Sequence, residues 1–453
     1  MNEKNTDRAA DIIIIGAGAS GMMAAISAAL CWKMNHIKNK QIFLIDQNER
    51  AGKKLLATGN GRCNLTNLKQ SPGCYMTCGS EPAVISGILS GFSPQDVIGF
   101  FKTSGMLTCD RNNYIYPKSM QAQTVADTLV RICESLNITF ILNECISSIC
   151  YLTSGVYRMI TGQGREFTAK SLILSTGSPA SVKRDYNGYK LAEMLGHSVI
   201  PPLPALCGLK ADFRRVAGTG AGKTFFKQTA GVRCEAAAQA VVNGIPVSRE
   251  RGELQITDYG LSGIVIFCLS RHISRGIFEK KPSAIWLDFL TDMTEPEVTA
   301  YLYEENGRNL TFHQALSGLL NSKLAKGLID ILAGKYKGIS DHTPVCRIKP
   351  AVMAKIIGEI KHFEVMIAQT NELQRAQVCC GGVDLSQMKE DSLESRKLPG
   401  LYMCGELLDV DGICGGYNLQ WAWSSGYRAG REAARRFCPG DIPKQKTERQ
   451  DGQ

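Results

Sequence analysis

A glycine-rich turn between an apolar strand and a helix of small residues most constrains how this chain can fold. Residues 11–15 are typical of a buried parallel strand, and the following GAGASG has the spacing G-x-G-x-x-G. A second apolar segment, QIFLID, ends in an acid that can accept hydrogen bonds from a ribose. We therefore expect a Rossmann-type dinucleotide site made by Gly16, Ala17, Gly18, Ser20, Gly21 and Asp46.

The loop after this acid indicates which dinucleotide is bound. Residues 51–67, AGKKLLATGNGRCNLTN, are rich in glycine, amides and cations, whereas a simple NAD-binding fold enters another helix at this point. Lys53, Lys54 and Arg62 are placed to meet a pyrophosphate or the edge of a flavin. FAD is therefore the expected cofactor, and a solvated basic loop is the alternative interpretation.

A glycine pair precedes the last helix of the chain. Gly415 and Gly416 follow a short strand at 401–404 and lead into a helix expected from about Tyr417. Glycines let backbone N–H groups approach a ligand closely, and a helix N-terminus adds about half a positive charge. This part of the chain is expected to stabilise an anion.

Five segments resemble the BaiN/YhiN-type flavoproteins of the two-dinucleotide-binding-fold FAD superfamily. They are GAGASGMMAA, GKKLLATGNGRCNLTN, LSTGS, TDYGLSG and GLYMCGELLDVDGICGGYNLQWAWSSGYRAG, so the resemblance covers the chain apart from its tails. Ile413 and Cys414 depart from the Pro-Thr of many relatives, which concerns the shape of the flavin pocket. The resemblance implies that Ile146 brings its backbone to the adenine and that Glu406 or Asp411 holds the ribitol chain. It also implies FAD contacts from Gly59, Asn60, Arg62, Cys63, Asn64, Thr176, Gly177, Gly405, Gly415, Gly416, Tyr417, Asn418 and Leu419.

The order of segments predicts an α/β protein with one domain inserted into another. A Rossmann-like FAD-binding domain is expected from residues 1–202 and 378–438, and the chain changes character at Pro201, Pro202 and Pro204. The inserted substrate domain is expected at 203–377, β-rich at 203–290 and 340–377 and helical at 295–339. A disordered tail is expected at 439–453. The flavin ring is expected where the domains meet, since ligands often bind at such places.

Three patterns in the inserted domain carry separate predictions. Asn243–Gly244 predicts a tight hairpin turn, and leucines from Leu316 to Leu328 at helical spacing predict a buried core stripe. Residues 217–224, AGTGAGKT, fit a relaxed phosphate-loop pattern. A phosphate loop needs a buried strand before it and a helix after it. Because the preceding segment is charged and the following one looks extended, no nucleoside triphosphate site is expected.

Composition and charge restrict the partners. The net charge of +10 over 453 residues favours anionic ligands, but no dense basic run is present, so no nucleic acid is expected. None of the 17 cysteines forms a C-x-x-C pair and the six histidines do not cluster, so no metal site is expected. Residues 12–32 lack charge but are broken by glycines. No other segment is judged apolar enough to span a membrane, and a cytoplasmic protein without a signal sequence is expected.

Two side-chain groups leave alternative roles open. Cys63 could be a reactive thiol near the flavin, but a small packing residue is the preferred interpretation. Asp409 and Asp411 could form a carboxylate pair for acid–base chemistry. The superfamily resemblance instead favours ribitol binding by an acid in this stretch.

The resemblance also implies an activity. Members of this family are described as reducing a carbon–carbon double bond conjugated to a ketone in bile-acid intermediates of the 3-oxo-Δ4 or Δ4,6 type, an anionic and apolar small molecule. NAD(P)H is expected as a transient reductant, because no second G-x-G-x-x-G follows the first. Tyr417 is the candidate catalytic proton donor, with Tyr259 as the other. The alternatives are an oxidase of a small amine and a flavin-bound protein that binds a nucleic acid or a partner protein; the oligomeric state is left undetermined.

Overall fold

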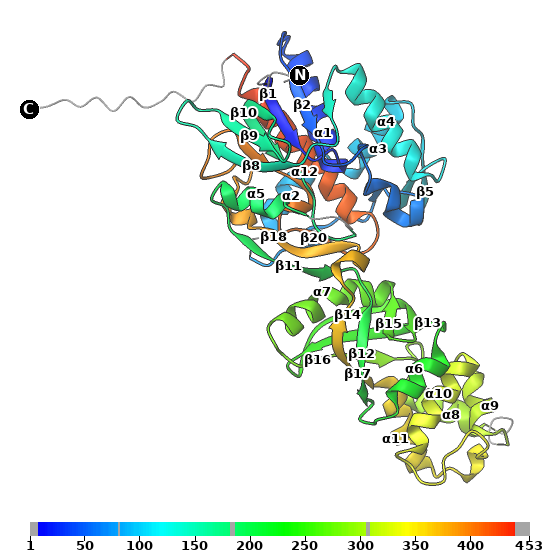
Figure 1. Cartoon of the computed structure of the whole chain (residues 1–453). Helices are drawn as coiled ribbons and strands as arrows, with labels where there is room; N and C mark the ends of the chain where they lie inside the picture. The colour runs from blue at the N-terminus through cyan, green and yellow to red at the C-terminus, as the bar shows by residue number, and fades with distance from the viewer. Residues whose placement is uncertain (1–7, 80–81, 182–185, 305–308, 440–453) are drawn as a thin grey trace, which may run out of the picture. The chain divides into compact units, whose positions relative to one another are not determined.

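The computed structural model describes residues 8–79, 82–181, 186–304 and 309–439. The chain divides into two compact units, Met1–Pro202 with Cys380–Gln453 and Leu203–Cys379. Apart from residue 439, the tail expected at 439–453 lies outside the described residues. The fold is α/β, as predicted, with a mainly parallel sheet in the first unit and a strand barrel with helices in the second (Figure 1).

The first unit is built on a seven-stranded sheet with β1 (Arg8–Ile15) at its centre. β1 is parallel to both of its neighbours, β2 (Ile42–Ile45) and β10 (Glu166–Leu174). Ile12 and Ile14 face one buried core and Ile13 and Ile15 face another, which is why this strand is apolar on both sides. The other strands are parallel β7 (Thr139–Ile141) and β19 (Leu401–Met403) and antiparallel β9 (Tyr157–Thr161) and β8 (Ile146–Tyr151).

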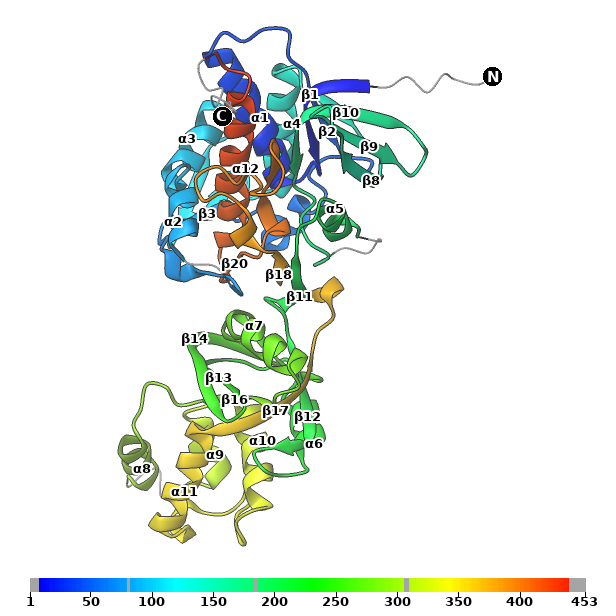
Figure 2. The same ribbon diagram turned by 90° about the vertical axis from the view of Figure 1, so that its left-hand side faces the viewer.

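Two helices from opposite ends of the chain pack against each other beside this sheet. They are α1 (Ala19–Met34) and α12 (Tyr417–Arg435), which lie side by side in Figure 2. A Cβ placed on Gly430 would stand 2.0 Å from the carbonyl oxygen of Ala24, so only glycine allows this approach. The Trp32 indole N–H also donates to the carbonyl of Ala434 at 3.0 Å.

Shorter elements complete the first unit. The helices are α2 (Pro82–Ser90), α3 (Pro94–Thr103), α4 (Ala122–Ser135) and α5 (Gly188–Met194). The short strands are β3 (Thr66–Asn67), β4 (Tyr75–Met76), β5 (Thr108–Arg111), β6 (Tyr114–Pro117) and β20 (Asp411–Gly412). β11 (Val199–Ala205) pairs with β18 (Val378–Val383).

One stretch corrects the expectation that no segment besides 12–32 is apolar enough to span a membrane. The stretch Val84–Thr103 is long and apolar enough to cross a membrane. Its mean hydropathy is 1.2 over an 18-residue window, and 33% of that window is buried. The stretch is divided into α2 and α3, because Ser93 caps α3 and accepts a hydrogen bond from the Asp96 backbone. Phe101 packs in the core beside β1. These features fit a core segment, and a single apolar stretch is weak evidence for a membrane span.

The second unit contains a closed barrel in the order β12-β15-β14-β13-β16-β17. Alternate residues such as Ala238, Leu254 and Ile285 fill its interior. Asn243 and Gly244 both have positive φ, 54° and 77°, so the predicted hairpin turn is confirmed. The strands are β12 (Leu209–Val216), β13 (Arg233–Val242), β14 (Ile245–Thr257), β15 (Gly260–Gly263), β16 (Ser283–Asp288) and β17 (Phe363–Thr370).

The predicted division of the inserted domain into β-rich and helical ranges was wrong in part. The helices expected at 295–339 are present, as α8 (Glu295–Tyr303), α9 (Phe312–Ser317) and α10 (Ser322–Ala333), and Leu316, Leu324 and Leu328 are buried. The ranges expected to be β-rich also hold helices, α6 (Gly222–Thr229), α7 (Ile264–Phe278) and α11 (Pro350–Lys361). Residues 264–278 fall within the range expected to be β-rich, although the buried residues of α7 recur at helical spacing.

The segment after AGTGAGKT was predicted to be extended; this was wrong for residues 225–229, which belong to α6, whereas the chain is extended again from Arg233 in β13. Phe225 and Phe226 lie next to each other in α6 and are both buried in the core of the barrel. Tertiary burial of these two rings decides the local structure of a segment that local propensity left ambiguous. β12 before it is an antiparallel barrel strand rather than the parallel strand of a phosphate-loop fold.

Candidate functional site

The three glycines of the first turn have three different surroundings in the structure. Gly16 has φ +105°, and a Cβ on it would stand 2.4 Å from the carbonyl oxygen of Ser175. A Cβ on Gly21 would stand 1.8 Å from the carbonyl oxygen of Gly16, so this glycine lets α1 press on the turn. Around Gly18 no described atom lies within 4 Å of such a Cβ. The turn and the packing thus need Gly16 and Gly21, while Gly18 faces open space that a pyrophosphate can occupy.

Asp46 stands at the end of β2 and binds back to the same turn. Its Oδ2 accepts the backbone N–H of Ala17 at 2.7 Å, and its Oδ1 accepts the backbone and side-chain N–H groups of Asn48 at 2.7 and 2.8 Å. A carboxylate offers about four acceptor positions, so about one remains for a ribose hydroxyl. Asn48 was not predicted, although an amide two residues after a strand-end acid is a common turn signal.

The expected adenine end lies beside this acid. The backbone N–H of Glu144 donates to the carbonyl of Asp46, which brings the start of β8 and Ile146 to the end of β2. Ile146 is buried, and its carbonyl oxygen accepts the Asn187 amide at 2.6 Å. Adenine contact through the Ile146 backbone remains a prediction.

A salt bridge joins the loop after β2 to the C-terminal segment. Lys54 Nζ lies 2.6 Å from Glu406 Oε2, and the Ser178 hydroxyl donates to Glu406 Oε1 at 2.7 Å. Lys53 and Arg62 are exposed. The predicted phosphate ligand Lys54 is therefore engaged with Glu406, and Ser178 is a further member of this cluster that the motif did not indicate.

The glycine- and asparagine-rich loop is a kinked turn. Gly59 and Asn60 have φ values of 55° and 54°, a conformation that glycine and asparagine tolerate better than other residues. Cys63 is fully buried, and burial raises the pKa of its thiol to about 12. These features favour the packing role of Cys63 over a reactive thiol.

An unsatisfied acceptor lies where this loop meets the glycine pair. Asn64 Oδ1 is buried and has no hydrogen-bond partner among the described residues. A Cβ on Gly416 would stand 2.8 Å from that oxygen, so Gly416 keeps the approach to Asn64 open. Gly415 and Gly416 have φ values of 126° and 96°, as expected for the turn into α12. A buried acceptor costs free energy unless a donor reaches it, and a cofactor N–H or O–H fits this place.

The start of α12 is shaped by its own side chains. Asn418 clamps Gly412, accepting its N–H and donating to its carbonyl at 2.8 Å each. The Gly405 backbone N–H donates to Ser425 Oγ at 2.9 Å, and a Cβ on Gly405 would stand 2.3 Å from Ser20 Oγ. The loops around the start of α12 are therefore shaped by Asn418, Gly405 and Ser20. Leu419 lies in the first turn of α12, where its backbone belongs to the helix N-terminus. The ends of the parallel strands add Thr176 and Gly177, and Gly177 has φ 71° with open space beside it.

Asp409 and Asp411 have different surroundings, although both are buried. Asp409 accepts the backbone N–H groups of Cys78 at 2.6 Å and Gly381 at 3.0 Å. A carboxylate held by two backbone donors organises chain segments, so Asp409 is poorly placed for acid–base work. Asp411 lies in β20 beside the glycine pair, where the ribitol role remains a prediction.

The two tyrosines predicted as proton donors lie in different units. The Tyr417 hydroxyl donates to the carbonyl of Lys69 at 3.3 Å, and its ring is buried. The Tyr259 hydroxyl accepts the Asn371 amide at 3.4 Å. Tyr417 would have to release Lys69 before it could protonate a substrate, and its catalytic role remains a prediction.

A buried polar network behind the site was not predicted from the sequence. The Thr66 hydroxyl donates to Gln420 Oε1 at 2.5 Å, and Gln420 Nε2 donates to Ser424 Oγ at 2.9 Å and to the carbonyl of Phe92 at 2.7 Å. All three side chains are buried. The one signal of this network in the sequence is the run LQWAWSS of α12, which places a Gln and two Ser on a helix that otherwise faces the core.

Among the described residues no group of His, Cys, Asp or Glu could hold a metal ion.

The glycine cradle, its strand-end acid and the open Gly18 position fit a dinucleotide, and the orphaned Asn64 oxygen fits a polar group of the same ligand. The chain thus has a Rossmann-type domain with a cradle that fits a dinucleotide. It belongs to the HI0933-like protein Rossmann domain family, whose model matches residues 10–432, and this confirms the resemblance seen in the sequence.

Characterised relatives extend along nearly the whole chain. The chain is 38% identical to the 3-dehydro-bile acid delta(4,6)-reductase of Clostridium scindens, over 93% of this chain and 98% of that protein. It is 29% identical to the ribosomal RNA dihydrouridine synthase of Escherichia coli, over 93% of this chain and 97% of that protein. A solved 3-ketosteroid delta1-dehydrogenase from Sterolibacterium denitrificans covers 94% of this chain and 99% of its own, with 12% identity and a TM-score of 0.47.

Proposed function

We propose that this protein is an FAD-dependent enzyme that uses NAD(P)H to reduce a carbon–carbon double bond conjugated to a carbonyl. The observation that carries the proposal is the 38% identity, over 93% of the chain, to a reductase of 3-dehydro-bile acids. The open position at Gly18 and the unsatisfied Asn64 oxygen support a bound dinucleotide. A 3-oxo-Δ4 or Δ4,6 bile acid is the first substrate to test.

In this proposal the protein binds and orients the cofactor, and bound FAD supplies hydride transfer between nicotinamide and substrate. Asp46 accepts a hydrogen bond from a ribose hydroxyl with its remaining acceptor position. The N-terminal turn of α12 stabilises negative charge in front of it. NAD(P)H visits transiently, since the sequence has a single G-x-G-x-x-G. Tyr417 and Tyr259 are the candidates that move a proton to the substrate carbon beside the carbonyl.

The test uses the purified full-length protein without oxygen. NADH and NADPH are added separately with a 3-oxo-Δ4 or Δ4,6 bile acid, and the steroid is followed by mass. We expect a gain of two hydrogens at the ring double bond and oxidation of one nicotinamide. If no enone is reduced in this assay, and a separate assay with oxygen shows rapid oxygen uptake with a small amine, the amine-oxidase alternative replaces the proposal.

A second candidate substrate is a uridine in RNA. The relative that favours it is the Escherichia coli ribosomal RNA dihydrouridine synthase, and the net charge of +10 suits an RNA partner. Uracil also contains a double bond conjugated to a ring carbonyl, so one cofactor chemistry serves both substrates. The same anaerobic assay is run with ribosomal RNA from cells that lack this protein, and dihydrouridine is measured by the mass of the nucleosides. Its formation distinguishes the RNA substrate from the bile-acid substrate.

A further inference from the structure

A row of outward-facing side chains crosses four neighbouring strands of the barrel in the second unit. Gln239 on β13 is paired with Arg249 on β14 and with Trp286 on β16, and Trp286 is paired with Glu364 on β17. The residues that alternate with them, such as Ala238 and Leu287, are buried inside the barrel. These four side chains therefore project from the same outer face.

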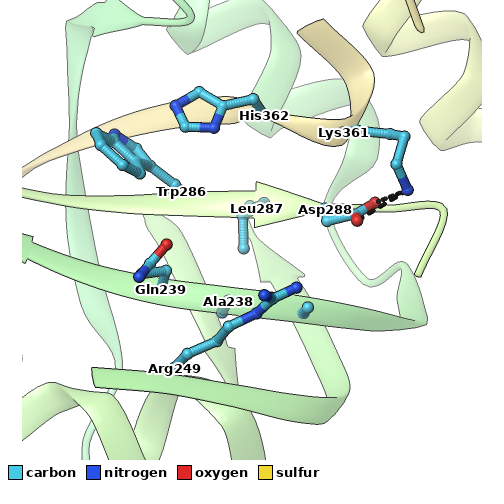
Figure 3. Close-up of a pocket in the computed structure, with 9 residues that line it drawn as sticks. Ala238, Gln239, Arg249, Trp286, Leu287, Asp288, Lys361 and His362 are labelled. Atoms are coloured by element: carbon cyan, nitrogen blue, oxygen red, sulfur yellow. Dashed lines mark hydrogen bonds and ion pairs between the residues drawn. The ribbon is translucent and has the colours of Figure 1, made fainter. Parts of the chain in front are cut away.

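A cavity lies next to this row because the adjoining row has a small residue in its middle. Ala237 is paired with Arg251 and with Asp288, so a methyl group stands between two larger, charged side chains. The cavity measures about 160 Å³. Its lining, shown in Figure 3, consists of Ala237, Ala238, Gln239, Arg249, Trp286, Leu287, Asp288, Lys361 and His362.

The indole of Trp286 is held as a partly exposed wall of this cavity. Its Nε1 donates to Glu364 Oε2 at 3.0 Å, which fixes the orientation of the ring. The ring centroid of His362 lies 4.3 Å away at an interplanar angle of 50°. A half-exposed, oriented tryptophan on a strand surface offers a stacking face for a flat ring.

The charged groups around the cavity divide into a satisfied pair and an available cation. Lys361 Nζ donates to both carboxylate oxygens of Asp288, at 3.1 and 2.9 Å, and to the carbonyls of Leu290 and Met293. This pair is engaged in the fold (Figure 3). Arg249 is exposed, and among the described residues no ion pair holds its guanidinium. Arg249 is therefore the cation that can meet a phosphate.

Further cations stand on the strand beyond β17. The Ala217 backbone N–H donates to the carbonyl of Glu364 at 2.7 Å, which places the end of β12 next to the residue that holds Trp286. Two exposed arginines precede that point, Arg214, with 89% of its side chain exposed, and Arg215; Arg214 forms a salt bridge with Asp212. A nucleic-acid backbone passing the cavity would meet these positive charges.

We propose that this cavity binds one unpaired pyrimidine nucleotide of an RNA chain. The base stacks on Trp286, the Gln239 amide bonds to the base edge, and Arg249 binds the adjoining phosphate. A cavity of about 160 Å³ is smaller than the pockets of about 300–1,000 Å³ that enclose drug-sized ligands. The proposal rests on the second candidate function, in which the substrate is RNA, and adds an RNA-binding subsite outside the cofactor cradle.

The test is a titration of the full-length protein with a fluorescein-labelled single-stranded oligouridylate of about ten nucleotides. Binding should quench tryptophan fluorescence and weaken as salt is raised. Trp286→Ala should weaken binding about 5- to 150-fold, while Trp286→Phe, which keeps a stacking face, should retain most of it. Arg249→Ala should lower the slope of log affinity against log salt by about one. The matched controls Phe278→Ala and Arg233→Ala alter exposed residues of the same unit outside the cavity and should bind like the wild type.

Several outcomes would overturn this subsite. One is a wild-type protein that does not bind the oligouridylate at low salt, and another is binding that survives Trp286→Ala. Equal affinity for duplex RNA or for anionic lipid vesicles would show general polyanion binding instead. Cofactor content and dihydrouridine formation in ribosomal RNA are measured on the same variants. Wild-type values of both, together with unchanged RNA binding in Trp286→Ala and Arg249→Ala, would reject the subsite alone. Absence of dihydrouridine formation by the wild-type protein would reject the RNA-substrate function on which the subsite rests.

Discussion

The ammonium of Lys54 lies 2.6 Å from the carboxylate of Glu406, a residue 352 positions further along the chain. The pair links the loop after β2 to the segment before α12, the two regions that the motifs assign to the cofactor. Both side chains are partly exposed, at 35% and 19%, so the pair contributes little stability. The pair shows that these two regions of the chain lie next to each other in the folded protein.

Gly18→Ala and Gly21→Ala are expected to fail for different reasons. Gly18 has φ −83° and open space around it, so alanine should fold normally but obstruct the cofactor, giving a stable protein with little bound FAD. At Gly21 a Cβ would stand 1.8 Å from the Gly16 carbonyl, so alanine should destabilise the protein itself. Thermal unfolding and the flavin absorbance of each variant are the measurements. A Gly18→Ala protein with full FAD content would show that the open space is not the pyrophosphate site.

Asp46→Ala should weaken FAD binding more than it changes the turnover of the protein that remains loaded. Loss of a charge-assisted hydrogen bond to ribose costs about 1.5–3 kcal/mol. The same change leaves the Ala17 N–H without its acceptor, so the free energy of unfolding should also fall. Asp46→Asn keeps an acceptor and is the matched control. Titration of each apo-variant with FAD measures the effect, and unchanged affinity in Asp46→Ala would contradict the ribose role.

Cys63 should resist alkylation in the folded protein. Burial disfavours its thiolate and raises the pKa from the ordinary 9.0 to about 12. Iodoacetamide at pH 8 should modify the exposed Cys346 and leave Cys63 intact, as read by peptide mass. Because the folded-state pKa is raised, the stability linked to this thiol is complete below pH 9 and decreases as the pH rises towards 12. Rapid labelling of Cys63 in the native state would restore the reactive-thiol interpretation.

Lys223→Ala should leave FAD content unchanged, and ATP should give no heat in calorimetry with either protein. A helix does begin within AGTGAGKT, at Gly222, but the strand before it belongs to an antiparallel barrel, and Phe225 and Phe226 of that helix are buried in the hydrophobic core of the second unit. Saturable ATP binding that disappears in Lys223→Ala would show that the motif is a working phosphate loop.

The sequence predicted those parts of the site that local backbone chemistry controls. Gly16, Gly59, Gly415 and Gly416 adopt positive φ, and the Asn243–Gly244 turn forms as expected. The strand–turn–helix order around them is likewise local, because an apolar run and a small-residue run each specify their own element. The same local rules failed for α6 and α7, where β-branched and aromatic residues are compatible with both a strand and a helix.

Only the tertiary structure decided which distant groups satisfy one another. Thr66 bonds to Gln420, Asp409 is occupied by Cys78 and Gly381, and Gln239 is paired with Arg249 on one side and Trp286 on the other. Each of these contacts depends on sheet order, strand register or helix packing, which bring together residues that no sequence spacing relates. The sequence by itself therefore determined the Rossmann-type turn and the other main turns, because φ preference and side-chain size act on neighbouring residues. The partners of the buried polar groups depend on long-range burial, and the folded chain alone decided them.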